Sequence, residues 1–89
     1  MRLEDTNHKN EARKIPMNLR MAQDGIEYLV KSVEIDDEEL VSFLFSLGCY
    51  SGEPITVVSH RKSGAVVSIK DGRYHFDKNL LEAILVEQA

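Results

Sequence analysis

The 89-residue sequence contains no tryptophan, only two prolines and a single cysteine, Cys49. One cysteine excludes an internal disulfide, which fits a reducing compartment. No apolar run approaches the roughly 18 residues that a membrane-spanning helix needs. The N-terminus also lacks the apolar stretch of a secretory signal peptide, so we expect a cytoplasmic protein.

Motifs for catalysis are lacking as well. Gly48 and Gly52 are not followed by the lysine and the serine or threonine of a phosphate-binding loop. Cys49 could act as a nucleophile only beside a base, and nothing in the sequence places His60 or His75 there. We therefore predict no catalytic residues, no cofactor-binding residues and no enzymatic activity.

Tight metal binding is not predicted either. The soft or borderline ligands are Cys49, His8, His60 and His75, and none is spaced as in Cys-x-x-Cys or His-x-x-x-His sites. We expect Cys49 to be a small buried apolar residue and the histidines to be solvated. A weak site among the acidic residues 36–39 stays open.

The total charge of −4 is unevenly distributed. Residues 1–20 carry five basic and three acidic side chains, a net charge of +2, so the rest of the chain carries −6. Such an acidic body disfavours nucleic-acid binding. Residues 1–16 are polar, with Leu3 and Ile15 as their only large aliphatic residues after the initiator methionine. We expect a disordered or loosely docked tail there, and one domain over residues 17–89.

An amphipathic helix is predicted near the middle of the chain, between residues 36 and 48. Its expected buried face has apolar residues at i, i+3, i+4 and i+7, namely Leu40, Phe43, Leu44 and Leu47. Asp36 is the expected N-cap, with Glu39 closing a capping box. Gly48 suits the left-handed position after the helix.

A first strand is predicted over residues 26–35, opened by Gly25. Its apolar residues alternate at first: Ile26, Tyr28 and Val30. Val33 and Ile35 are one position out of phase with them. A strand can keep both sets on one face only if it contains a bulge, which we place near residues 31–32.

The remaining strands are predicted after the helix. A second strand starts at Pro54, a polar loop covers residues 60–64, and a third strand covers residues 65–70. Asp71-Gly72 predicts a two-residue type I′ turn. This turn pairs Ile69 with Tyr74 and Val67 with Phe76, all four on the core face.

A short helical turn capped by Asp77 and a last strand over residues 84–86 complete the pattern. The predicted fold class is mainly β: a small, partly open barrel of about five strands with one inserted α-helix and a short helical turn.

Three apolar residues have no place in this predicted core. Val41 and Phe45 form a second i, i+4 pair that flanks the buried stripe, and Tyr50 follows the helix without a strand partner. We predict that Val41, Phe45 and Tyr50 form a partner-binding surface, here named the docking patch. The alternative, that they widen the domain's own core, stays open. A patch this small favours weak contacts, including a homo-oligomer at high concentration.

From Leu19 to Val86 the sequence resembles the FeoA family, small cytoplasmic accessory proteins of bacterial ferrous-iron transport. The most specific match is Phe43-Leu44-x-x-Leu47-Gly48 followed by Gly52, with Ile55 and Val57 at the usual spacing after it. Other positions fit the family pattern: Leu19, Gly25, Tyr28, Val30, Val33, Tyr74, Phe76, Ile84 and Val86. Two features depart from it, the tail before Met17 and the serine at position 51 where proline is common.

The resemblance implies an SH3-like barrel with no activity of its own and no tightly bound cofactor, although weak Fe²⁺ binding stays open. It also implies a partner, the cytosolic GTP-binding part of a FeoB-type ferrous-iron permease, without nucleic-acid binding or membrane insertion. The same fold forms the C-terminal module of metal-dependent repressors of the DtxR type. A metal-sensing or transcription-linked domain is therefore the alternative, disfavoured because no winged-helix domain precedes this one in the sequence.

Overall fold

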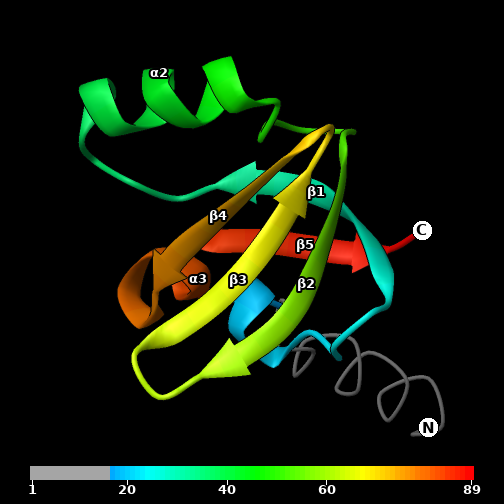
Figure 1. Ribbon diagram of the computed structural model, residues 1–89. Coiled ribbons are helices and arrows are strands. Elements are labelled where there is room, and N and C mark those ends of the chain that lie inside the picture. Colours follow the sequence, from blue (N-terminus) through cyan, green and yellow to red (C-terminus); the bar gives the residue numbers. More distant parts are fainter. Residues whose placement is uncertain (1–16) are drawn as a thin grey trace, which may run out of the picture.

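The computed structural model describes residues 17–89, which form one antiparallel sheet with two α-helices and a 3-10 turn (Figure 1). The strands are β1 (Glu27–Val33), β2 (Pro54–Arg61), β3 (Gly64–Ile69), β4 (Gly72–Asp77) and β5 (Ile84–Gln88). The helical elements are η1 (Leu19–Met21), α2 (Glu38–Leu47) and α3 (Lys78–Ala83). The predictions for residues 1–16, including those for His8, lie outside the described residues.

The strand order is β4-β3-β2-β1-β5, and the sheet curls without closing, so that β4 and β5 are its edges. In Figure 1, β5 crosses behind β3 and β4. This arrangement confirms the predicted mainly β, SH3-like, partly open barrel with one inserted helix and a short helical turn. Among residues 17–89, no helix is both long enough and apolar enough to cross a membrane.

Two bulges help the sheet to curl. The β1–β5 register shifts between Val30 and Ser32, which confirms the predicted bulge. A second shift, between Val57 and Ser59 in the β2–β3 pair, was not predicted. Because a bulge bends its strand and increases the local twist, each turns the sheet toward a barrel.

Alternate strand residues fill the interior, and each helical element adds one fully buried leucine: Leu19 from η1, Leu44 from α2 and Leu81 from α3. Asp77 caps α3 as predicted, accepting a hydrogen bond from the Leu80 amide at 2.8 Å. Ile26, predicted to open the first strand in alternation with Tyr28 and Val30, is 47% exposed, because β1 begins one residue later and leaves it outside the ladder.

The β3–β4 turn differs from the prediction. Its two central residues are Lys70 and Asp71, and Ile69 pairs with Gly72. Gly72 lies in β4, where the Tyr74 ring covers it: a Cβ there would meet the Tyr74 hydroxyl at 2.2 Å. Compared with the prediction, the pairing of β3 with β4 is shifted by two residues, so that Val67 pairs with Tyr74. Because side chains alternate with a period of two, this shift leaves every side chain on its predicted face.

The β2–β3 loop is also shorter than predicted. Arg61 pairs with Gly64, so only residues 62–63 form the turn, and His60 belongs to β2. The polar character of residues 60–64 reflects exposure at the end of the hairpin and not a lack of strand structure.

Candidate docking surface

α2 has well-defined caps at both ends. Asp37 is the N-cap, and its carboxylate accepts hydrogen bonds from the amides of Glu39 at 3.0 Å and Leu40 at 3.2 Å. The prediction of Asp36 was therefore wrong by one residue, and Glu39 lies one position too early to close a capping box.

The C-terminal cap matches the prediction. Gly48 adopts a left-handed φ of 101°, and its amide donates to the carbonyl of Phe45. The amide of Cys49 donates to the carbonyl of Leu44 at 2.9 Å. These two bonds form a Schellman motif, with the buried side chains of Cys49 and Leu44 close to the turn.

The helix packs on the barrel through a narrow stripe. Leu44 is fully buried, and Leu40 and Leu47 are half-buried against the core. Phe43, predicted in this stripe, is 54% exposed. In Figure 1, α2 stands at one end of the barrel, away from the sheet.

At about 100° per residue, Phe43 and Phe45 lie on opposite flanks of the buried stripe. Phe45 is 60% exposed and stacks on Tyr50, with ring centroids 4.4 Å apart and an interplanar angle of 28°. The structure therefore brings together two of the three predicted residues of the docking patch.

The turn after α2 holds this stacked pair in place. The amide of Glu53 donates to the carbonyl of Tyr50 at 3.0 Å, and the amide of Gly52 donates to Val30 in β1 at 2.8 Å. Because both rings are carried by hydrogen-bonded backbone, the stacked arrangement is part of the folded domain itself.

Val41 lies one turn before Phe45 on the same flank of α2. It is half-buried and lines a hollow of about 460 Å³ with Ile35, Asp36, Glu38 and Ser42. Val41 thus extends the apolar flank toward the start of the helix, where the surface becomes acidic.

The charges around α2 are mostly negative. Acidic residues occupy positions 36–39 before and within its first turn, and the helix has no lysine or arginine. At the other end, the Lys70 ammonium donates to the Glu53 carboxylate at 2.5 Å, and this hydrogen bond raises the pKa of Lys70. The carbon chain of Lys70 lies against Gly48. This cation is therefore already paired, and the free charge beside the patch is acidic.

The other candidate residues are the cysteine and the histidines. Cys49 is buried as predicted, and burial raises the pKa of its thiol to about 11, so the thiol is neutral near pH 7. His60 is exposed but not simply solvated, since its Nδ1 lies 2.5 Å from the Asp24 carboxylate and its Nε2 3.1 Å from the Arg20 carbonyl. The Nε2 of His75 lies 3.4 Å from the Ser63 hydroxyl. Within residues 17–89, no three Cys, His, Asp or Glu side chains are grouped closely enough to hold a metal ion.

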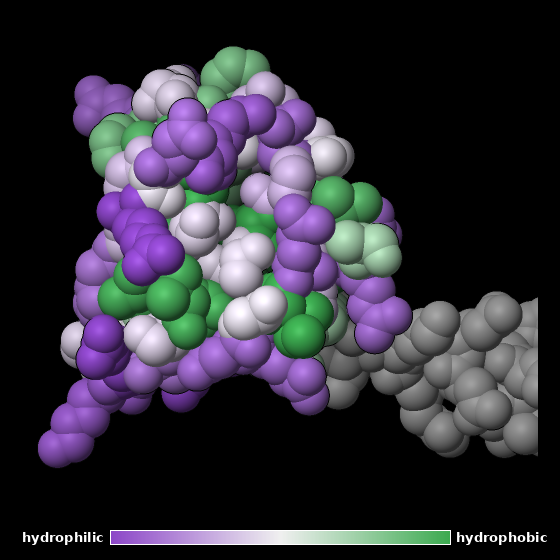
Figure 2. All heavy atoms as spheres, turned by 45° about the vertical axis from the view of Figure 1, so that its right-hand side comes forward, coloured by the Kyte–Doolittle hydropathy of each residue, from purple (hydrophilic) through white to green (hydrophobic). Residues whose placement is uncertain are grey.

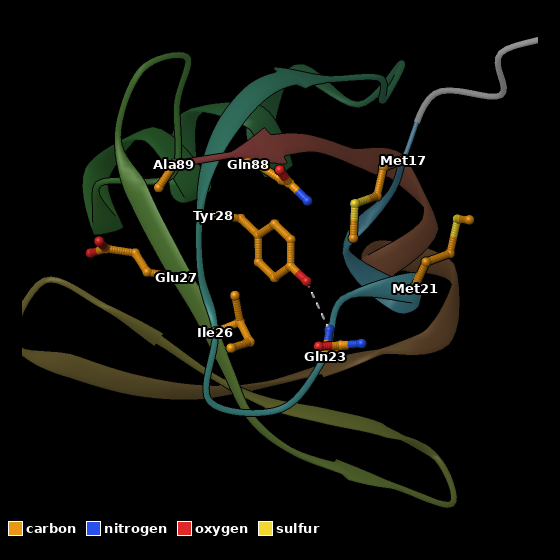
Figure 3. Close-up of a pocket in the computed structure, with 8 residues that line it drawn as sticks. All are labelled: Met17, Met21, Gln23, Ile26, Glu27, Tyr28, Gln88 and Ala89. Carbon is orange, nitrogen blue, oxygen red and sulfur yellow. Dashed lines mark hydrogen bonds between the residues drawn. The ribbon is translucent and has the colours of Figure 1, made fainter.

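Sequence reasoning missed a second hollow, of about 420 Å³, where η1 meets the start of β1 and the end of β5 (Figure 3). Its lining consists of Met17, Met21, Gln23, Ile26, Glu27, Tyr28, Gln88 and Ala89. The Tyr28 hydroxyl accepts a hydrogen bond from the Gln23 amide at 3.1 Å. Placing Ile26 inside the first strand, in alternation with Tyr28 and Val30, hid this site. On the face drawn in Figure 2, hydrophobic side chains likewise reach the surface in separate patches.

The comparison with protein families is decisive. The FeoA domain pattern matches residues 17–88. This chain belongs to the FeoA family. The match spans the barrel, η1 and α2, so the docking patch lies within the FeoA domain.

Solved structures agree with this assignment. Iron(II) transport protein A from Clostridium thermocellum is 25% identical with a TM-score of 0.73, and the match covers 82% of this chain and 46% of that one. A FeoA described as an iron uptake regulatory protein is 20% identical with a TM-score of 0.69, covering 83% and 97%. The FeoA-family chain thus spans about half of the first protein and nearly all of the second.

A manganese-dependent transcriptional repressor shares the same fold, at 20% identity and a TM-score of 0.72, over 85% of this chain and 44% of the repressor. This likeness concerns the fold alone. No curated protein matches the sequence.

Proposed function

We propose that this FeoA-family protein is a non-enzymatic accessory module of ferrous-iron uptake. It works in the cytoplasm by docking on the cytosolic GTP-binding part of a FeoB-type permease. The observation that carries the proposal is the stacking of the exposed Phe45 ring on the half-buried Tyr50 at the hydrogen-bonded end of α2, within a FeoA domain. The module needs no tightly bound metal for this role.

An exposed aromatic ring stacked on a half-buried one is well suited to docking. Aromatic residues dominate binding hot spots because they bury large areas at a low cost in conformational entropy. Phe45 has 60% of its surface available for burial, and its ring orientation is already set by Tyr50. The acidic first turn of α2 favours a partner surface with an apolar pocket bordered by basic residues.

The proposal is tested with the double variant Phe45→Ser, Tyr50→Ser. We expect its affinity for the cytosolic part of a FeoB-type permease to fall by about tenfold or more, since hot-spot truncations typically cost about 2 kcal/mol or more. Isothermal titration calorimetry measures the affinity, and circular dichroism shows whether the domain remains folded.

Phe43→Ser is the matched control, because Phe43 lies on the same helix with similar exposure but on the opposite flank. It should leave the affinity unchanged. If the double variant stays folded and binds as tightly as the unmodified protein, the docking patch is not the binding surface. If the double variant unfolds, the two rings belong to the core instead.

A further inference from the structure

The barrel has two edge strands, and the chain covers them unequally. The outer edge of β5 is partly covered: the Val86 amide donates to the Met17 carbonyl at 2.8 Å, and Asn18 forms an antiparallel bridge with Leu85. By contrast, nothing in residues 17–89 pairs with the outer edge of β4, which has only β3 as a strand neighbour (Figure 1). An unpaired strand edge is a template on which a further strand can form.

The β3–β4 register shows which backbone groups of β4 face outward. Ile69 and Gly72 close a two-residue turn, so they exchange hydrogen bonds, and bonding pairs then alternate with non-bonding pairs along the ladder. Counted from Gly72, every second residue of β4 bonds to β3, whereas the amides and carbonyls of Arg73 and His75 point away from it. Among the described residues, these outward groups have no backbone partner. They offer donors and acceptors at the spacing that a partner strand requires.

The side chains at this edge are basic. Arg73 and His75 are exposed on the outer face of the sheet, and the Nε2 of His75 lies 3.4 Å from the Ser63 hydroxyl in the β2–β3 turn. Lys62 belongs to the same turn and is also exposed. Neither Arg73 nor Lys62 forms an ion pair with another described residue. The edge therefore carries positive charge that the described domain does not neutralise.

The charge of the domain is divided along the chain in the same sense. Residues 54–76, which contain β2, β3 and most of β4, have four basic residues and one acidic residue, a net charge of +3. Residues 17–53 have two basic and eight acidic residues, a net charge of −6. A partner that approaches β4 therefore meets the basic part of an otherwise acidic domain. Complementarity favours a negatively charged partner at this place.

The alternation of β4 defines the sequence pattern of such a partner. Residues of an added strand opposite Arg73 and His75 lie on the outer face, where carboxylates form favourable cross-strand pairs with basic side chains. The residue between them lies opposite Tyr74 and points to the other face. The Tyr74 ring is stacked with that of Phe76, with centroids 6.4 Å apart, so an apolar side chain there extends an aromatic surface. The pattern that fits is acidic, apolar, acidic in an extended conformation.

We propose that the outer edge of β4 binds an extended acidic segment of a partner protein, which adds to the sheet as an antiparallel strand opposite residues 73–75. In this mode of recognition the backbone hydrogen bonds provide affinity, and alternate side chains provide specificity. The surface lies on β4 and is basic, whereas the docking patch lies on α2 and its turn and is bordered by acidic residues. The inference therefore does not depend on docking to a permease.

Amide hydrogen exchange followed by nuclear magnetic resonance tests the proposal with a synthetic peptide. The probe is the capped peptide Thr-Glu-Val-Glu-Val-Thr, and its Kd is obtained from a chemical-shift titration. At a free peptide concentration of about ten times Kd, the amides of Arg73 and His75 should exchange about tenfold more slowly than without peptide. The amides of Tyr74 and Phe76 already bond to β3 and serve as the internal reference.

The control peptide Thr-Glu-Glu-Val-Val-Thr has the same composition without the alternation. It should bind about threefold or more weakly than the probe, because only one carboxylate can then face the basic edge. Equal binding of the two peptides overturns the proposed pattern. Unchanged exchange of the Arg73 and His75 amides in excess probe overturns the proposal as a whole.

Two charge reversals locate the binding surface. Arg73→Glu should weaken probe binding by about fivefold or more, because a favourable cross-strand pair becomes a repulsive one. Arg61→Glu is the matched control, since it makes the same change on β2, two strands from the edge. At that separation of about 10 Å, salt screens most of the interaction, so we expect less than a twofold effect, about the limit of detection. Arg73→Gln, which removes the charge without reversing it, should give a smaller loss than Arg73→Glu.

Circular dichroism establishes that each variant is folded. Equal weakening by Arg73→Glu and Arg61→Glu would show that general electrostatic attraction, and not strand pairing at β4, holds the peptide. If the Arg73 and His75 amides are already protected without peptide and lose that protection on dilution, the edge binds a second copy of the chain, and the proposal of an acidic partner is overturned.

Discussion

Replacing Leu44 by alanine tests how α2 is attached to the barrel. The Leu44 side chain is fully buried, and only the half-buried Leu40 and Leu47 accompany it on the stripe. Full burial of a leucine contributes about 1.5–3 kcal/mol, and the cavity left behind raises the cost of truncation to about 2–5 kcal/mol. Because small domains have a total stability of about 5 kcal/mol or little more, this one change should remove a large share of it.

The assay is urea unfolding followed by circular dichroism. The free energy of unfolding of small domains typically falls by about 1 kcal/mol per molar urea. At that slope, the urea concentration at which half of the protein is unfolded should fall by about 2 M or more. Phe43→Ala is the matched control on the same helix, and we expect a change of about 0.5 kcal/mol or less because Phe43 is mostly exposed. If the two variants lose equal stability, α2 is not anchored through Leu44.

Two further predictions concern the ends of α2. Asp37→Ala should cost about 0.5–2 kcal/mol in urea unfolding, whereas Asp36→Ala should cost less than about 0.5 kcal/mol; equal losses would contradict the observed N-cap. Burial raises the pKa of the Cys49 thiol from 9.0 to about 11, so the folded state favours the neutral thiol. The stabilisation that the neutral thiol contributes is therefore complete below pH 9 and is lost as the pH rises toward 11. The stability difference between the unmodified protein and Cys49→Ala should therefore shrink across that range, and a constant difference would refute the assignment.

The strands and their faces could be predicted because side-chain alternation is a strong local signal. The bulge near residue 31 follows from two apolar sets that are out of phase, and the structure confirms it. The β3–β4 turn could not be placed correctly, because Asp-Gly is the usual turn signal, whereas the cross-strand pairing of Ile69 with Gly72 makes Lys70 and Asp71 the turn residues. The second bulge, after Val57, has no comparable signature in the sequence.

The helix shows the limit of periodicity. Leu40, Phe43, Leu44 and Leu47 fit an apolar face equally well, yet the barrel end covers only the leucines. How much of a helical face is covered depends on the shape of the surface beneath it, which sequence spacing does not contain. The stacking of Phe45 on Tyr50 likewise depends on the turn through Gly48 and Gly52, which brings the chain back alongside the helix end.

The two ends of α2 are held differently, so the two ends of the docking patch differ in how firmly they are fixed. The C-terminal end is fixed by the two hydrogen bonds of the Schellman motif and by the hydrogen bond from the Gly52 amide to the Val30 carbonyl. The side chain of Lys70 also lies against Gly48 there. The N-terminal end is held by its own cap and by Leu40, at the edge of the core. In the proposed docking, a partner would meet the stacked aromatic pair at the fixed end and a less constrained flank, with Val41, at the other. Binding energy should be concentrated on Phe45 and Tyr50, and Val41 should adjust to the partner's surface with a smaller contribution.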